Sequence, residues 1–231
     1  MVATPSQVEE VLFGSGGAEP VLAAGTVVLL MATVGPDPVT EWAVRLARRS
    51  VAVVDAPVSG GVARAATGDL LVMQSGPATA LRRVAELVAA LSRQAPVVGP
   101  VPGDGQRVKL VNQLLCGVHI AAAAEALAFA ESLGLDARTC WETIRHGAAA
   151  SFMLDDRGER MLTGAFDDVR SALDIFVKDM GLVVGAANAA GQPVPLASVA
   201  AKRYHEGGRT GLGRRDDSVL IELARSSRTP G

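Results

Sequence analysis

The stretch from Val51 to Gly61 reads VAVVDAPVSGG, and it decides the fold of the first half of the chain. Its first four residues are an uninterrupted apolar run, which predicts a strand buried on both faces and ending at Asp55. The loop that follows lies at the carboxyl end of this strand, where open α/β sheets bind ligands. There the hydroxyl of Ser59 and the unobstructed N–H groups of Gly60 and Gly61 could hold a carboxylate. The same residues also fit an ordinary turn rich in proline and glycine.

Strand and helix patterns alternate on both sides of this stretch. Apolar runs predict further strands at residues 26–31, 70–73 and 95–98. Helical spacing predicts helices at residues 37–49, with Asp37 as the N-cap, and at 78–92. Such alternation indicates a parallel, doubly wound α/β sheet.

The second half of the chain has a different pattern. From Gly105 onward no strand candidate occurs, and one predicted helix follows another. The first of them, residues 106–133, is apolar on nearly all sides, which predicts a helix buried in a core. Proline and glycine cluster at residues 100–105. We therefore expect an α/β domain at residues 1–102 and an all-α domain at 103–231.

Composition excludes several classes of partner. The formal net charge is −2, from 22 basic and 24 acidic residues with no long block of one sign, whereas a nucleic-acid binder would carry a basic stripe. The longest apolar run, residues 21–33, is too short to span a bilayer and is interrupted by Gly25 and Thr26. We expect a soluble protein that binds neither nucleic acid nor membrane.

Cysteine and histidine positions give no sign of a metal site. Cys116 and Cys140 stand alone in helical segments, which is typical of a protein of the reducing cytoplasm. His119, His146 and His205 are far apart and match no metal-ligand spacing. We expect no bound metal.

Lys109 is the first candidate catalytic residue. It lies near the start of the apolar helix, and Asn112 and Gln113 follow at spacings that place all three on one helix face. No acidic residue occurs at helical spacing before Glu125. Desolvation lowers the pKa of a buried lysine, which suits it to accept and return a proton near neutral pH. The alternative is a lysine whose stem lies along the helix start and whose amine reaches water.

The pair Lys178–Asp179 is a weaker candidate, inside a predicted amphipathic helix. Asp174 lies four residues before Lys178, so a surface ion pair along the helix explains the lysine equally well.

Taken in order, these segments resemble the β-hydroxyacid dehydrogenase family over essentially the whole chain. The run from Asp55 to Gly61 is similar to the family's substrate-binding signature, and Gly105 to Gln113 is similar to its catalytic segment, with Lys109 at the position of the catalytic lysine. Residues 111–120, 174–179 and 193–196 most resemble its L-threonate dehydrogenase branch.

The resemblance implies a Rossmann-like domain that binds NAD, or NADP, followed by an all-helical domain. It implies that Lys109 handles the proton of the substrate hydroxyl while hydride leaves for the nicotinamide. The substrate-binding residues it implies are Ser59, Gly60, Gly61, Asn112 and Gln113. The cofactor-binding residues it implies are Thr33, Lys178 and Asp179. A small hydroxy acid is the expected substrate, and a homodimer or homotetramer the expected assembly.

Three departures from the family pattern stand out. No Gly-x-Gly-x-x-Gly turn follows a strand, so we expect a partial Rossmann-like parallel sheet whose first βα units are missing. Ala32–Thr33 stands where relatives usually have Ser–Thr. Gln113 stands where many relatives have a second asparagine, although the threonate-like branch shares the glutamine.

Two alternatives remain open on the sequence. One is a non-catalytic dimerisation or binding remnant without the dinucleotide fingerprint. The other is a dehydrogenase of the 3-hydroxyisobutyrate or tartronate-semialdehyde type. A third reading, 6-phosphogluconate-type decarboxylation, is disfavoured because no basic clamp for a sugar phosphate is recognisable.

Overall fold

A computed structural model describes residues 1–226 and divides the chain into two compact units, which meet in sequence between Val111 and Asn112. The strands are β1 (Val27–Leu30), β2 (Ala52–Asp55), β3 (Val58–Ser59), β4 (Leu70–Val72), β5 (Gln74–Ser75), β6 (Ser92–Gln94) and β7 (Val97–Gly99). The α-helices are α1 (Pro5–Phe13), α2 (Pro36–Ala47), α3 (Gly61–Ala66), α4 (Ala78–Leu91), α5 (Asp104–Ser132), α6 (Ala137–Ile144), α7 (Phe152–Thr163), α8 (Leu173–Ala189), α9 (Pro195–Arg209) and α10 (Leu220–Ser226). Two 3-10 helices are η1 (Glu19–Val21) and η2 (Asp217–Val219).

The first unit contains two sheets of mixed strand direction rather than the single parallel sheet predicted. Strand orders are β1-β2-β5-β7 and β3-β4-β6. The pairs β1–β2, β5–β7 and β4–β6 are parallel, but β2–β5 and β3–β4 are antiparallel. The prediction was wrong there because a parallel pair needs a crossover of a dozen or more residues. Only the short segment 60–69 separates β3 from β4, so the chain folds back as a hairpin with α3 at its tip.

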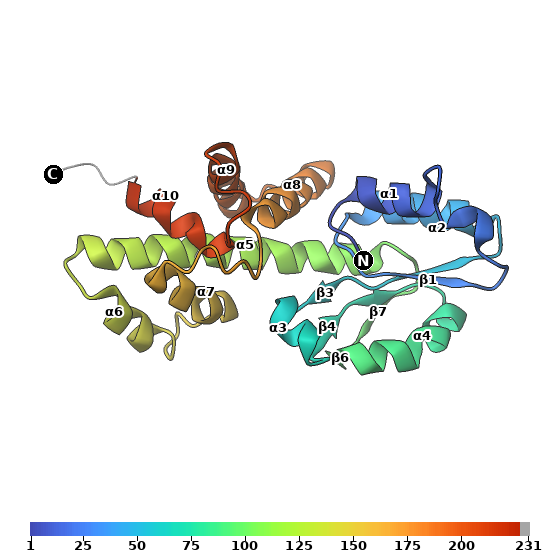
Figure 1. Cartoon of the computed structure of the whole chain (residues 1–231), viewed down its shortest axis with the longest axis horizontal. Coiled ribbons are helices and arrows are strands. Elements are labelled where there is room, and N and C mark those ends of the chain that lie inside the picture. The colour runs from blue at the N-terminus through green and yellow to red at the C-terminus, as the bar shows by residue number, and fades with distance from the viewer. Residues whose placement is uncertain (227–231) are drawn as a thin grey trace. The chain divides into compact units, whose positions relative to one another are not determined.

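Helices cover both faces of β1 and β2 (Figure 1). Val53 belongs to an apolar cluster with residues of α1 and α2, such as Leu12 and Trp42. Its neighbour Val54 points to the other face and joins a cluster with Val84 of α4. Successive strand residues thus bury opposite faces, which explains why this strand is apolar without alternation.

Helix α2 begins one residue before the predicted cap. Its N-cap is Gly35, with φ of +86°, and Pro36 is the first helical residue. Glycine adopts this left-handed backbone without steric cost, and proline suits the first helical position. Asp37 therefore lies in the first turn, and its prediction as the cap was wrong.

The second unit is built from helices, as predicted. Tyr204 of α9 stacks on Phe176 of α8, with ring centroids 5.3 Å apart, and its hydroxyl donates to the carbonyl of Gly117 in α5 at 2.9 Å. One buried side chain thus joins three helices. No strand occurs among the described residues of this unit.

A buried ion cluster fixes the segment before α10. Asp216 accepts hydrogen bonds from Arg160 Nε at 2.9 Å and from the Ser218 hydroxyl at 2.6 Å. Burial acts to raise the pKa of Asp216, but the hydrogen bonds from Ser218 and Arg160 outweigh it and hold the pKa below its usual value. Arg157 binds Asp217 through two N–H···O bonds of 3.0 and 2.9 Å.

Helix α5 is only partly buried within this chain. The prediction of a helix that is buried on all sides was therefore wrong, because one face of α5 is exposed. Val111, Leu115 and Phe129 are 63, 50 and 61% exposed. By length and composition α5 passes the test for a membrane-spanning helix, but the buried core helix of a soluble protein passes the same test. Its other face packs into the core, where Ile120 and Leu127 are fully buried.

Candidate functional site

Lys109 lies in the second turn of α5 and is only 6% exposed. A lysine is seldom this buried, because removing an ammonium from water is costly unless other groups compensate. The chain has three lysines, and the other two are the partly exposed Lys178 and the exposed Lys202. Lys109 is therefore the buried amine of this protein.

The start of α5 is held by Asp55, the residue at which the sequence predicts that the buried strand ends. Asp55 is fully buried at the end of β2. Its Oδ2 accepts from the backbone N–H groups of Gly103 and Gln106 at 3.0 Å each and from the Ser75 hydroxyl at 3.2 Å. Burial raises its pKa, although the hydrogen bonds from Gln106, Gly103 and Ser75 act in the opposite direction. The carboxylate satisfies N–H groups that a helix start leaves unpaired.

Ser59, Gly60 and Gly61 lie where β3 ends and α3 begins, at the tip of the hairpin. Gly60 and Gly61 have φ of +137° and +68°, so both use backbone conformations that favour glycine. A Cβ at Gly61 would meet no atom within 4 Å, whereas one at Gly60 would lie 2.9 Å from the Arg64 side chain. The backbone is thus open on the Gly61 side, as a ligand cradle requires.

The second unit joins four of the predicted residues in one hydrogen-bonded chain. Asn112 Nδ2 donates to Gln113 Oε1 at 2.8 Å, and Gln113 Nε2 donates to Asp179 Oδ2 at 2.5 Å. Asp179 also pairs with Lys178, with 2.7 Å between Nζ and Oδ1. Asp179 is almost fully buried, which fits a carboxylate whose charge is compensated by bonded partners.

Thr33 lies in the loop between β1 and α2. The residues beside it are fixed by Gln106 of α5, whose amide bonds the carbonyl of Ala32 and the N–H of Val34. Sequence reasoning missed Gln106, because the sequence gives no sign that residue 106 bonds to residues 32–35.

The described residues contain no group of three or more His, Cys, Asp or Glu side chains that could hold a metal ion. Cys116 and Cys140 are not in disulfides.

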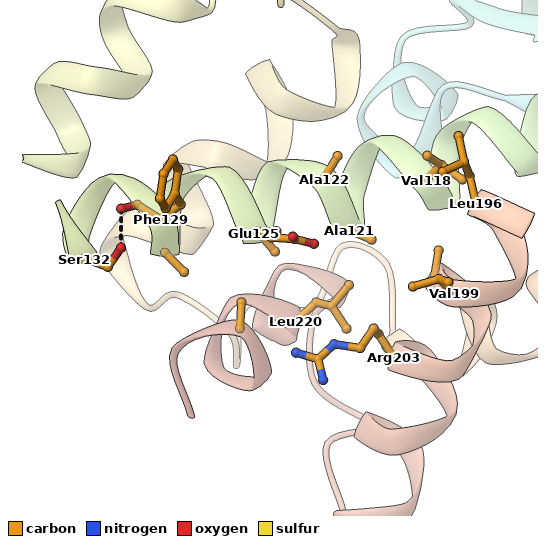
Figure 2. Close-up of a pocket in the computed structure, with 14 residues that line it drawn as sticks. Val118, Ala121, Ala122, Glu125, Phe129, Ser132, Leu196, Val199, Arg203 and Leu220 are labelled. Atoms are coloured by element: carbon orange, nitrogen blue, oxygen red, sulfur yellow. Dashed lines mark hydrogen bonds between the residues drawn. The ribbon is translucent and has the colours of Figure 1, made fainter. Parts of the chain in front are cut away.

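A groove of about 590 Å³ lies in the second unit among α5, α9 and α10 (Figure 2). Val118, Phe129, Leu196, Val199 and Leu220 give it apolar walls, with Glu125 and Arg203 as its charged groups. None of the predicted site residues lines it.

Two family models match the chain. The NAD binding domain of 6-phosphogluconate dehydrogenase matches residues 1–99, and the NAD-binding model of NADP-dependent 3-hydroxyisobutyrate dehydrogenase matches residues 103–224. The chain is 39% identical over all 231 residues to L-threonate dehydrogenase of Cupriavidus necator and covers 77% of that protein.

Solved structures agree with these matches. The 3-hydroxyisobutyrate dehydrogenase of Salmonella typhimurium has a TM-score of 0.91 and 37% identity, covering 96% of this chain and 77% of that one. The corresponding enzyme of Mycobacterium tuberculosis, solved with L-serine, has a TM-score of 0.83 and 25% identity, covering 97% and 78%.

These findings define the chain as an NAD(P)-dependent oxidoreductase. Within that class it belongs to the β-hydroxyacid dehydrogenase family and is a hydroxyacid dehydrogenase. The family resemblance and the cofactor predicted from the sequence are thereby confirmed.

Proposed function

We propose that this enzyme oxidises a small hydroxy acid of the L-threonate type and that Lys109 is its acid/base. The buried Lys109 amine carries the proposal, since a buried amine that can exchange a proton is what oxidation of a hydroxyl requires. The identity to L-threonate dehydrogenases supports the substrate class.

Each predicted residue has a role in this proposal. Lys109 accepts the hydroxyl proton and, in the reverse direction, stabilises the negative charge that develops on the oxygen. The backbone of Ser59, Gly60 and Gly61, which is open on the Gly61 side, binds the substrate carboxylate. Asn112 and Gln113 orient the hydroxyl.

NAD or NADP supplies the hydride acceptor when bound. The residues for it are Thr33, Lys178 and Asp179, and their donor chemistry fits: an ammonium with one-fifth of its side chain exposed, held by a buried carboxylate, can donate to a carboxamide oxygen. We propose that residues 1–102 belong to the dinucleotide-binding domain and that residues 103–231 form the substrate and dimerisation domain.

We also propose that the enzyme is cytoplasmic and that the groove among α5, α9 and α10 is covered by a second copy of the chain. Exposed Phe129, Leu196 and Val199 supply the apolar area, and Glu125 and Arg203 supply both charges. A two-fold pair would let Glu125 of each copy face Arg203 of the other, since both copies use the same patch in such a pair.

Lys109→Ala tests the acid/base assignment. Turnover should be abolished while affinity for the cofactor stays within a few-fold, and Lys202→Ala, at an exposed lysine, should match the parent enzyme. A Lys109→Ala enzyme that keeps most of its rate would refute the assignment.

A second candidate substrate is 3-hydroxyisobutyrate, because the similar Salmonella structure bears that name. Turnover of four-carbon and three-carbon hydroxy acids with NAD and NADP decides between them. The highest kcat/KM is expected for L-threonate, and a preference for 3-hydroxyisobutyrate would replace our assignment.

A further inference from the structure

Gln106 is a buried amide whose hydrogen-bonding capacity is fully used. It has no exposed surface. Its Oε1 accepts from the backbone N–H groups of Val34 and Gly35 at 2.9 and 3.0 Å. Its Nε2 donates to the carbonyl of Ala32 at 3.0 Å and to Asp55 Oδ1 at 2.7 Å. An amide has two donors and two acceptor sites, and here each has a partner.

No other side chain supplies this set at the same length. A glutamate would lose both donors and place a second carboxylate beside Asp55. An asparagine is one methylene shorter and would not reach Ala32 and Asp55 together. The site therefore specifies glutamine by chemistry and by length.

The side chain of Gln106 joins its own helix to two separate segments of the first unit. Residues 32–35 form the loop that contains Thr33, and Asp55 ends β2. Gln106 itself lies in the first turn of α5, three residues before Lys109, so the two side chains are neighbours on the helix surface.

Packing leaves little room for this arrangement to shift. A Cβ at Gly105 would lie 2.6 Å from the carbonyl oxygen of Met73 and 2.9 Å from Asp55 Oδ2. The start of α5 thus lies directly against the sheet end, and Asp55 binds it through a backbone N–H and the Gln106 side chain.

We infer that Gln106, held by Asp55, is a positioning residue that fixes the Thr33 loop relative to Lys109 for hydride transfer. This inference rests on the proposed function, in which Lys109 contacts substrate and Thr33 contacts cofactor. Gln106 acts through these two residues and does not itself take part in the chemistry.

Hydrogen exchange on the unmodified full chain gives the first test, independent of activity. The amides of Val34 and Gly35 lie outside any strand or helix, yet they should exchange slowly because Gln106 accepts from both. Rapid exchange at both amides would overturn the inference without any variant.

Gln106→Asn gives the second test, with Gln74→Asn as its matched control. Gln74 is also a buried glutamine of the first unit, but its side-chain amide donates to the carbonyl of Ala95 instead. Gln106→Asn should lower kcat about 10- to 100-fold, as expected for a displacement near 1 Å, with KM for the hydroxy acid within about threefold. It should also speed exchange at Val34 and Gly35.

Gln74→Asn should keep kcat within about twofold and slow exchange at residues 34 and 35, because its bond to Ala95 does not involve the Thr33 loop. Equal kcat losses in both variants, or an unchanged kcat in Gln106→Asn, would make Gln106 merely structural and overturn the inference. Lys109→Ala in the same assay separates the two proposals. If it retains turnover, the acid/base assignment fails; if it is inactive while Gln106→Asn keeps its kcat, only the positioning role fails.

Discussion

Gln113 of α5 donates a 2.5 Å hydrogen bond to the buried carboxylate of Asp179 in α8, 66 residues away in sequence. Because Asp179 also pairs with Lys178, the amide and the ammonium share one carboxylate. A substitution at Gln113 therefore alters the carboxylate that holds Lys178, in addition to any contact that Gln113 makes with a ligand.

Gln113→Leu should destabilise the protein by about 1–3 kcal/mol, because it removes a hydrogen bond to a buried charged group. Urea unfolding at neutral pH measures the change. Gln192→Leu is the control, since Gln192 is exposed and its side-chain amide donates to the carbonyl of the adjacent Pro193. Equal unfolding midpoints for the two variants would contradict the importance of the Gln113–Asp179 bond.

Gly105→Ala should destabilise the protein by about 1–3 kcal/mol. Its Cβ would meet the backbone oxygen of Met73, and this oxygen can move only if the adjoining strand end moves with it. Gly181→Ala in α8 is the opposite case, because a Cβ there meets nothing within 4 Å. Alanine should stabilise that exposed helical position by about 0.5–1 kcal/mol. Thermal melts of both variants test whether the first loses stability and the second gains it. A Gly105→Ala protein as stable as the parent would show that the backbone at Met73 can move to accommodate the added methyl group.

Asp216→Asn should cost about 3 kcal/mol at pH 7, because it removes a charge partner from the buried Arg160. The folded-state pKa of Asp216 is below the ordinary 3.8, so its ionised form stabilises the protein above that pH. This stability is lost as pH falls through the folded-state pKa. The gap between parent and variant in urea unfolding should therefore narrow below about pH 4.

The control for Asp216 is Asp167→Asn, which breaks an exposed ion pair with Arg215. It should cost less than about 1 kcal/mol at pH 7. A gap for Asp216→Asn that stays constant down to pH 3 would show that its carboxylate does not supply the stability.

Val199→Glu should reduce the molar mass in solution from that of the oligomer to that of the monomer, since it places a charge in the groove among α5, α9 and α10. Val44→Glu on α2 is matched in exposure and should leave the mass unchanged. Sedimentation velocity measures both. A monomeric parent protein, or a Val199→Glu protein of unchanged mass, would contradict the proposed assembly.

The sequence predicted those strands and helices that depend on the pattern of nearby residues. The buried strand ending at Asp55 and the long helix carrying Lys109 both formed, because apolar runs and helical spacing act within a few residues. The two-residue strands β3 and β5 had no such signal, and their pairing depends on a fold-back across residues 60–69.

The sequence did not predict the roles of Gln106 and Asp55, because these depend on hydrogen bonds between residues far apart in the chain. Gln106 and Asp55 are 51 residues apart, and neither side chain differs in type from one found on a surface. The exposed face of α5 was missed for a related reason: composition shows that a face is apolar, but not whether the same chain covers it.

The chain passes from its first compact unit to its second inside α5, with neither a loop nor a proline at the crossing. Proteases cut extended backbone, so separating the two units requires several turns of this helix to unwind first. Fragments for separate expression would therefore have to divide a continuous helix, and each would carry a new helix end whose backbone groups lack their partners.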